Sequence, residues 1–228
     1  MEIDDYAFSL GADVFGVADL DYLRDYPTYP DGLLDGFSRG IVVGVKISDA
    51  VFDGLPETRA LYARQYTVAN EILDRIAFKI VRFIEKRGFN AIPIPASKKL
   101  KDGHWSSFIS HKAIARAAGL GWIGKNLLLI TKEYGPRIRM ASVLTDMPLE
   151  TGEPVKRRCG RCTECIESCI VNALKDVDFV DFPKREDVFD VDRCADRLNE
   201  FASDPDIGVM VCGMCVKVCP WGKRRARS

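Results

Sequence analysis

The hydrophobic positions in the first part of the chain alternate between helical and strand-like spacing. Helix signals in "DDYAFSLGA" precede two apolar strand patterns, "DVFGVADL" and "GIVVGVKI". A long amphipathic stretch follows from Pro56 to Gly88, and "NAIPIPA" then reads as a strand that its two prolines restrict to a sheet edge. The long stretch carries four apolar residues at helical spacing: Ile72, Ile76, Ile80 and Phe83. The pattern predicts an α+β layer structure with this stripe in its core.

The pattern of residues 111–146 predicts a short helix followed by two strands. "SHKAIARAAG" places Ile114, Ala115 and Ala118 on one helical face and ends at Gly119, a favourable C-cap. "NLLLITKEYGPRIRMASVLTD" then predicts an apolar strand, a turn at "YGP" and an alternating second strand. We expect these two strands to form a β-hairpin.

The segment "AGLGWIGKN" between this helix and the first strand fits two phosphate-loop patterns. Its three glycines give G-x-G-x-x-G, and "GLGWIGK" gives all but the last residue of G-x-x-x-x-G-K-[ST], with Asn126 replacing the hydroxyl. Both motifs require a strand before the glycines and a helix after them, so that helix N–H groups face phosphate. The order here is reversed and the magnesium-ligating hydroxyl is missing, so the pattern disfavours nucleotide binding.

Composition and charge restrict the class of protein. The 228 residues are 47% hydrophobic and 29% charged, which is typical of a globular protein. Lysine plus arginine equals aspartate plus glutamate, 33 each, so nucleic acid is not expected as a partner. Uncharged runs are too short for a membrane-spanning helix. The acidic start "MEIDDYAFSL" lacks the pattern of an export signal, which predicts a cytoplasmic protein.

The eight cysteines are confined to the last 70 residues and form two runs. The first run is Cys159-x2-Cys162-x2-Cys165-x3-Cys169, the second is Cys212-x2-Cys215-x3-Cys219, and Cys194 lies between them. In bacterial two-cluster ferredoxins, three closely spaced thiolates hold one cluster and the fourth reaches the other. The spacing therefore predicts two [4Fe–4S] clusters with crossed ligands. The first takes Cys159, Cys162, Cys165 and Cys219, and the second takes Cys194, Cys212, Cys215 and Cys169.

Structural zinc is the alternative interpretation of these cysteines. Zinc sites favour paired C-x2-C knuckles, and three ligands within seven residues fit that pattern poorly. Disulfides are not expected in a reducing compartment. The cysteine distribution also predicts two domains, an α+β domain over residues 1–150 and a ferredoxin-like domain over residues 151–228, joined near "PLETGEP".

Few other side chains suggest catalysis. His104 and His111 are the only histidines, and both precede the glycine segment, so we treat them as candidate catalytic residues. Trp122 stands among three glycines, where an indole could pack against a flat ligand or simply fill a turn.

The stretch "SHKAIARAAGLGWIGKNLLLITKEYGPRIRMASVLTDMPL", followed by the two cysteine runs, resembles the shared core of epoxyqueuosine reductases and corrinoid reductive dehalogenases. The resemblance covers most of residues 60–221. It implies a nitroreductase-like α+β domain that binds cobalamin and receives electrons through two [4Fe–4S] clusters. It further implies that the glycine segment shapes the corrinoid pocket through Gly119, Gly121, Trp122, Gly124, Lys125 and Asn126.

The chain departs from this family pattern in three places. Epoxyqueuosine reductases carry an aspartate at the position that aligns with Trp105, and their C-terminal helical repeats would lie beyond Ser228. The twin-arginine export signal of respiratory dehalogenases is also missing. We therefore expect a short form of the family.

The expected function is that of an iron–sulfur oxidoreductase. Electrons would come from a ferredoxin or flavodoxin and pass through both clusters to cobalamin, for reduction of a small-molecule or corrinoid-linked substrate. Two alternatives remain open at this point. One is a non-catalytic electron carrier or activator of a partner corrinoid protein, and the other is a zinc-stabilised binding module.

Overall fold

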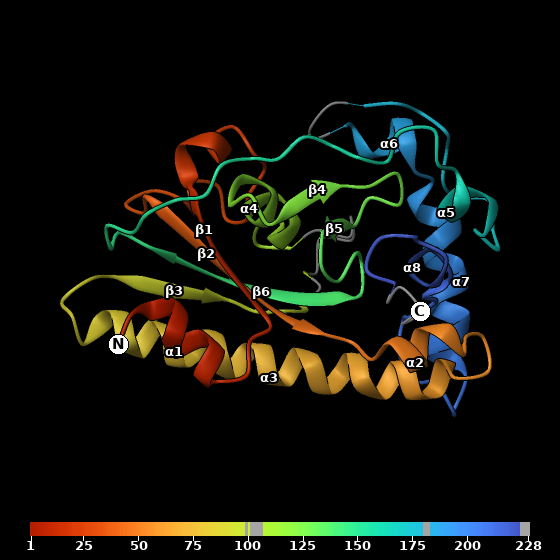
Figure 1. Ribbon diagram of the computed structural model, residues 1–228, viewed down its shortest axis with the longest axis horizontal. Coiled ribbons are helices and arrows are strands. Elements are labelled where there is room, and N and C mark those ends of the chain that lie inside the picture. The colour runs from red at the N-terminus through yellow and green to blue at the C-terminus, as the bar shows by residue number, and fades with distance from the viewer. Residues whose placement is uncertain (99, 101–106, 180–182, 224–228) are drawn as a thin grey trace, which may run out of the picture. The chain divides into compact units, whose positions relative to one another are not determined.

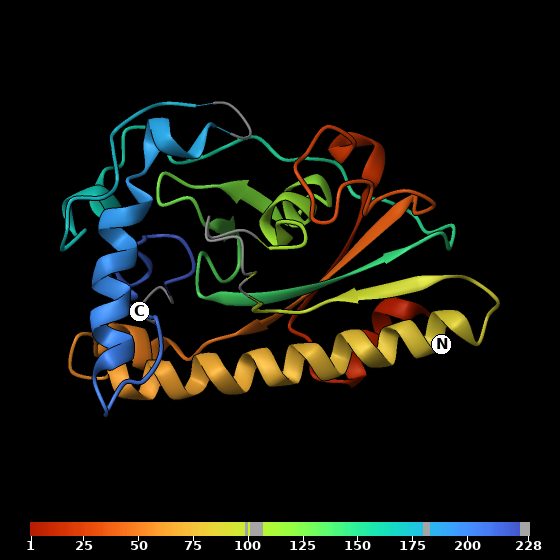
Figure 2. The same cartoon turned by 180° about the vertical axis from the view of Figure 1, so that it is seen from behind.

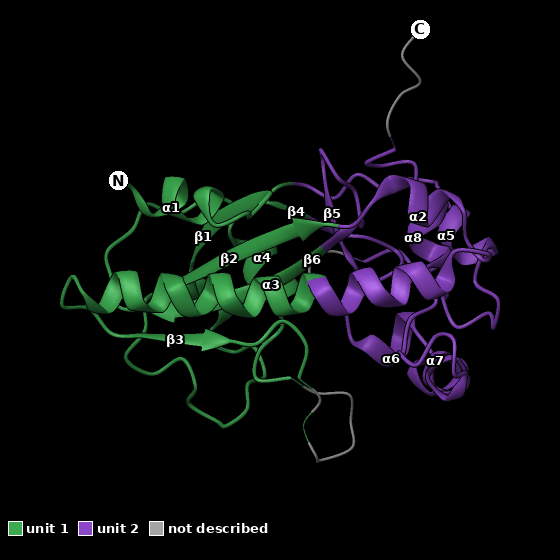
Figure 3. Ribbon diagram, turned by 90° about the horizontal axis from the view of Figure 1, so that it is seen from below, with its two compact units in different colours: residues 1–46, 69–121, 139–155 green, residues 47–68, 122–138, 156–228 purple. Residues whose placement is uncertain are grey.

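The computed structural model describes residues 1–98, 100, 107–179 and 183–223. These residues divide into two compact units, each made of three chain segments (Figure 3). The first unit comprises residues 1–46, 69–121 and 139–155, and the second comprises residues 47–68, 122–138 and 156–228. None of the described helices combines the length and the apolar character that a bilayer span demands.

A four-stranded sheet forms the centre of the first unit (Figure 1). Its order is β1 (Val14–Asp19), β2 (Arg39–Lys46), β6 (Ile138–Thr145) and β3 (Ala91–Ile94). β1 pairs with β2 in antiparallel register, and β3 pairs antiparallel with β6. The proline-containing strand β3 therefore lies at a sheet edge, as the sequence predicts.

Helices cover both faces of this sheet. Helix α1 (Ile3–Ser9) and the long helix α3 (Arg59–Glu85) lie on one face, whereas α4 (His111–Ala117) lies on the other (Figures 1 and 2). The short 3-10 helix η1 (Leu20–Leu23) follows β1. Alternation along β2 explains the two layers, because Ile41 faces the α3 core while the neighbouring Gly40 meets α4.

The apolar stripe of α3 is confirmed with one correction. Its fully buried residues include Leu73, Ile76, Ile80 and Ile84, at the i, i+3 and i+4 spacing of one helical face. Ile72, which we expected in the core, is 36% exposed. It is one residue away from Leu73 and so points about 100° around the helix from the buried face.

The predicted β-hairpin is wrong, although both of its strands exist. β5 (Leu129–Thr131) pairs with β4 (Gly121–Ile123) in a separate two-stranded sheet, and β6 joins the four-stranded sheet. The chain reverses between β4 and β5, where the Asn126 Oδ1 accepts a 3.1 Å hydrogen bond from the Leu128 N–H. This Asx turn supplies β5 with a closer partner than β6.

The second unit carries the cysteines on loops and short helices. These helices are α2 (Asp49–Asp53), α5 (Glu164–Glu167), α6 (Arg185–Val188), α7 (Val191–Ser203) and α8 (Met214–Lys217). The last segment of this unit begins at residue 156, near the predicted junction. The unit also includes residues 47–68 and 122–138, so it is not the continuous domain of residues 151–228 that the sequence predicts. The reason is packing, because Leu55 and Tyr62 lie against Gly213 of the second cysteine run.

Candidate functional site

The eight cysteines are all free thiols. Cys165, Cys194 and Cys215 belong to α5, α7 and α8, and the other five lie on adjoining loops. Helix α8 follows Gly213, whose φ of 81° is a left-handed conformation that glycine adopts without strain. The short helices between tight turns keep the thiols of each run close together.

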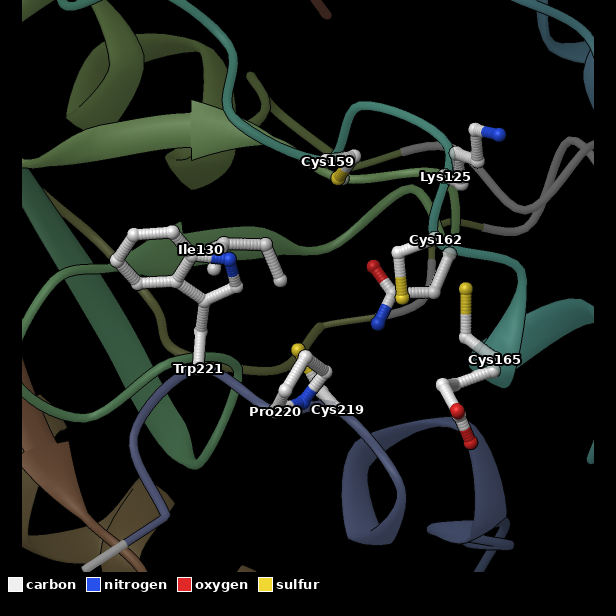
Figure 4. A pocket seen from close by; sticks show the side chains of 11 residues that line it. Lys125, Ile130, Cys159, Cys162, Cys165, Cys219, Pro220 and Trp221 are labelled. Atoms are coloured by element: carbon white, nitrogen blue, oxygen red, sulfur yellow. The ribbon is translucent and has the colours of Figure 1, made fainter. Parts of the chain in front are cut away.

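Four thiols line one pocket of the second unit. They are Cys159, Cys162, Cys165 and Cys219, and Figure 4 shows their sulfurs around a common space. Burial raises the pKa of Cys165 to about 12, and the neighbouring Cys159, Cys219 and Cys162 raise it further. Burial likewise raises the pKa of Cys219 to about 11, with Cys159 and Cys162 contributing. This group is the predicted ligand set of the first cluster.

The remaining four thiols influence one another in the same way. Burial raises the pKa of Cys194 to about 11, and Cys169 and Cys212 add to the effect. The pKa of Cys215 is also raised, first by burial and then by Cys212, Cys165, Cys194 and Cys169. The neighbours of Cys194 are therefore those predicted for the second cluster. Cys165 from the first set also lies close enough to act on Cys215.

This arrangement fits four-iron clusters in its donor chemistry. Across the described parts of the chain, no three His, Cys, Asp or Glu side chains stand close enough to share a single metal ion. In a [4Fe–4S] cluster each thiolate binds its own iron, so four sulfurs can surround a pocket without meeting at one point. Iron would also offset the raised thiol pKa values, because metal binding favours the thiolate form.

Three residues of the glycine segment form part of the first pocket's wall. Lys125 is 6% exposed, and its Nζ lies 2.6 Å from the Asp176 Oδ1. Asn126 is 7% exposed and donates from Nδ2 to the Cys215 carbonyl oxygen at 3.3 Å. Gly124 lines the same pocket, and a Cβ there would lie 2.8 Å from the Asn126 Oδ1. This part of the segment therefore faces cysteines.

The rest of the glycine segment is engaged in internal packing. Gly119 has a φ of 75°, and a Cβ there would lie 2.4 Å from the Glu153 carbonyl oxygen. Trp122 is 2% exposed and meets Trp221 edge to face at 4.7 Å between ring centroids, while Gly121 is buried at the start of β4. This geometry does not fit the open wall that a corrinoid requires. Cobalamin binding through these six residues stays a prediction.

The two candidate histidines have different outcomes. His104 lies outside the described residues. His111 is held at both ring nitrogens, with Nδ1 2.8 Å from the Ser142 Oγ and Nε2 3.0 Å from the Pro95 carbonyl oxygen. Because a carbonyl only accepts, Nε2 carries the proton and Nδ1 accepts from the serine hydroxyl. The arrangement favours a structural role for His111, and its catalytic role stays a prediction.

The His111 environment predicts a specific pH dependence of stability. Burial lowers its pKa from 6.5 to about 4, and the Arg139 and Lys112 charges contribute, against the opposing effect of the Pro95 hydrogen bond. Since the folded pKa is below the unfolded one, His111 stabilises fully above pH 6.5. Its contribution falls as the pH drops from 6.5 to about 4, by about 3 kcal/mol at most. We expect the difference in thermal midpoint between the wild type and His111→Gln to shrink between pH 7 and pH 5. A difference independent of pH would contradict the assignment.

Sequence reasoning missed two arginines of the second unit. Arg137 is 1% exposed, pairs with Asp49 at 3.1 Å and Asp53 at 2.8 Å, and donates to the Lys217 carbonyl oxygen at 3.3 Å. The i, i+4 spacing of the two aspartates on α2 was the available signal, because it places them on one helical face. Arg59 donates to the Cys212 carbonyl oxygen at 3.4 Å, which no sequence pattern indicates.

Comparison with known proteins agrees with the cysteine geometry. The family model "4Fe-4S double cluster binding domain" matches residues 158–222. This match contains all eight cysteines and favours two clusters over structural zinc.

The chain is also similar to curated epoxyqueuosine reductases. It is 38% identical over 120 residues to that of Gloeobacter violaceus, a match that covers 52% of this chain and 38% of the relative. It is 28% identical over 258 residues to that of Vibrio cholerae serotype O1, covering 97% of this chain and 66% of the relative. The chain thus spans less than two thirds of the length of these relatives.

Solved structures share the fold. Epoxyqueuosine reductase from Bacillus subtilis superposes with a TM-score of 0.66 at 21% identity, over 97% of this chain and 64% of that one. The catabolic reductive dehalogenase NpRdhA superposes with a TM-score of 0.75 at 21% identity, over 97% of this chain and 31% of that one. These matches confirm the α+β fold with a ferredoxin-like module. The chain is therefore similar in sequence to epoxyqueuosine reductases, and it shares its fold with them and with reductive dehalogenases.

Proposed function

We propose that this iron–sulfur oxidoreductase conducts single electrons through both clusters into a reductive reaction. The observation that carries the proposal is the proximity of the two thiol sets. Asn126 lines the pocket of the first set and donates to the Cys215 carbonyl oxygen of the second at 3.3 Å. Thiolate-held clusters exchange one electron at a time, so two neighbouring clusters make a relay. A ferredoxin or flavodoxin is the proposed electron donor.

Cobalamin is the proposed electron acceptor. One neighbouring reductive dehalogenase structure, 21% identical with a TM-score of 0.75, is associated with a mechanism for B12-dependent dehalogenation. When bound, a corrinoid supplies a cobalt centre that accepts single electrons. Because the glycine segment is too closely packed to form an open wall of a corrinoid pocket, we propose no role for its residues in the reaction with cobalamin.

The substrate class now includes nucleic acid. Our expectation that nucleic acid is not a partner conflicts with an epoxyqueuosine reductase structure, 22% identical, that holds an epoxyqueuosine-modified tRNA-Tyr stem loop. In this chain Lys156, Arg158 and Arg161 are exposed around the start of the first cysteine run. Such cations attract phosphate, so overall neutrality was a poor guide to this surface. We propose a tRNA substrate beside the small-molecule and corrinoid-linked classes.

An anaerobic cobalamin titration tests the acceptor. The holoprotein with both clusters should bind about one cobalamin per chain and reduce its cobalt when dithionite-reduced ferredoxin is added, as followed by visible absorption. A Cys165→Ser variant should slow this reduction at least tenfold, because the relay is interrupted. A fully loaded protein that binds no cobalamin would reject the acceptor. If it reduced a separate corrinoid protein instead, the electron-carrier alternative would be supported.

A tRNA shift assay tests the substrate class separately. The modified stem loop should bind the holoprotein with an affinity that falls as salt rises, because phosphate contacts release counterions. A variant with Lys156, Arg158 and Arg161 replaced by glutamine should bind more weakly and lose part of the salt dependence. Equal binding by the two proteins would exclude this basic group as a tRNA contact.

A further inference from the structure

Asn126 is a buried amide in the wall of the first cluster's pocket. It is 7% exposed and lines this pocket with the four thiols of the first set. The turn between β4 and β5 places it there, since its Oδ1 accepts the Leu128 N–H at 3.1 Å. The backbone thus fixes the amide at the pocket.

The hydrogen bonds of Asn126 define the orientation of its amide group. Oδ1 faces a backbone N–H donor, and Nδ2 lies 3.3 Å from the Cys215 carbonyl oxygen, an acceptor. In the flipped orientation, Nδ2 would face the Leu128 N–H, which is also a donor, and Oδ1 would face the Cys215 carbonyl oxygen, which is also an acceptor. An asparagine amide carries two N–H groups, and only one bonds to a protein group among the described residues.

We propose that Asn126 donates its second amide N–H to a sulfur of the first cluster and thereby raises that cluster's reduction potential. A buried donor without an acceptor is destabilising, which favours a sulfur partner within this pocket. Hydrogen bonds to cluster sulfurs help to set the potential, because they stabilise the more negative reduced state. The proposal rests on cluster binding and is independent of cobalamin and of the substrate.

The neighbouring Lys125 does not provide this contact. Its ammonium bonds the Asp176 carboxylate at 2.6 Å, and Figure 4 shows its side chain directed away from the labelled sulfurs. Asn126 also bonds the carbonyl of Cys215, a ligand of the second cluster. A single side chain therefore contacts the ligand sets of both clusters, which suits a position that adjusts the electron relay.

Redox titration of Asn126→Asp is the first test. Aspartate preserves the size of the side chain and the acceptor for Leu128, but it removes both N–H donors and adds negative charge. We expect the equilibrium constant for reduction of the first cluster to fall at least tenfold, which lowers its reduction potential by about 59 mV for a one-electron couple. Asn126→Leu should shift it in the same direction by a smaller amount. Asn199→Asp is the matched control, because Asn199 is exposed on α7.

A spectroscopic measurement decides the proposal even if the variants lose iron. Holoprotein labelled with amide-¹⁵N asparagine should show a nitrogen coupling to the reduced first cluster in pulsed EPR, and Asn199→Asp should retain it. The absence of ¹⁵N coupling in the labelled wild type would overturn the proposal. So would an unchanged first-cluster potential in a fully loaded Asn126→Leu variant. Iron and sulfide analysis identifies any protein without clusters, which would count against cluster binding itself.

Discussion

Replacing Cys169 by alanine should remove the second cluster and spare the first, although Cys169 belongs to the first cysteine run. The pKa values of Cys194 and Cys212 are raised partly by the Cys169 thiol, so these three sulfurs are neighbours. The Cys169 Sγ also accepts the Ala173 N–H at 3.2 Å, which holds it in place. Iron should fall from about eight to about four atoms per chain.

The matched variant is Cys219→Ala, which should produce the opposite result. Cys219 belongs to the second run but lines the pocket with Cys159, Cys162 and Cys165. Iron content alone would be similar in the two variants, so EPR of the reduced proteins must distinguish them. The crossed assignment fails if Cys169→Ala loses the same EPR signal as Cys159→Ala. It is supported if Cys219→Ala and Cys159→Ala lose the same signal.

The grouping of four thiols around one pocket could be predicted from sequence, because the spacing of the cysteines acts locally, whereas their role as cluster ligands stays a prediction. Three thiols that are each separated by two residues must lie close together whatever surrounds them. The spacing of the fourth thiol in the run predicts that it reaches the other cluster. The helical span of α3 was predictable for a similar reason, since its buried residues repeat at helical spacing. Strand pairing was not, because β6 lies between β2 and β3, which are far away in sequence, and does not pair with the neighbouring β5.

The glycine segment shows where prediction from sequence ended. Its reversed helix–strand order disfavoured a phosphate loop, and α4 indeed precedes β4. Its partners could not be inferred, because Asn126 bonds a carbonyl 89 residues later and Trp122 packs against Trp221. The resemblance to a corrinoid family predicts cobalamin as the ligand of these residues, which stays a prediction. In the structure they pack internally or line the pocket of the first thiol set.

Gly135 and Gly222 should both be essential for the position of the chain that follows Cys219. The two glycines lie in segments whose backbones approach so closely that neither glycine has space for a Cβ atom. A Cβ at Gly135 would lie 1.9 Å from the Trp221 carbonyl oxygen, and one at Gly222 would lie 2.1 Å from the Tyr134 carbonyl carbon. Both obstacles are backbone atoms, which cannot rotate away as a side chain can.

Gly135→Ala should therefore destabilise the protein by about 3 kcal/mol and reduce occupancy of the first cluster. The displaced Trp221 carbonyl lies two residues after Cys219, so we expect this cysteine to move with it. Gly208→Ala is the matched control, since Gly208 has a similar φ of 63° but nothing within 4 Å of an added Cβ. It should show only the strain of a left-handed alanine, about 1 kcal/mol. The measurement is denaturant unfolding under anaerobic conditions, with cluster absorbance followed in parallel. Equal losses in the two variants would mean that backbone conformation, and not the Trp221 contact, accounts for the effect.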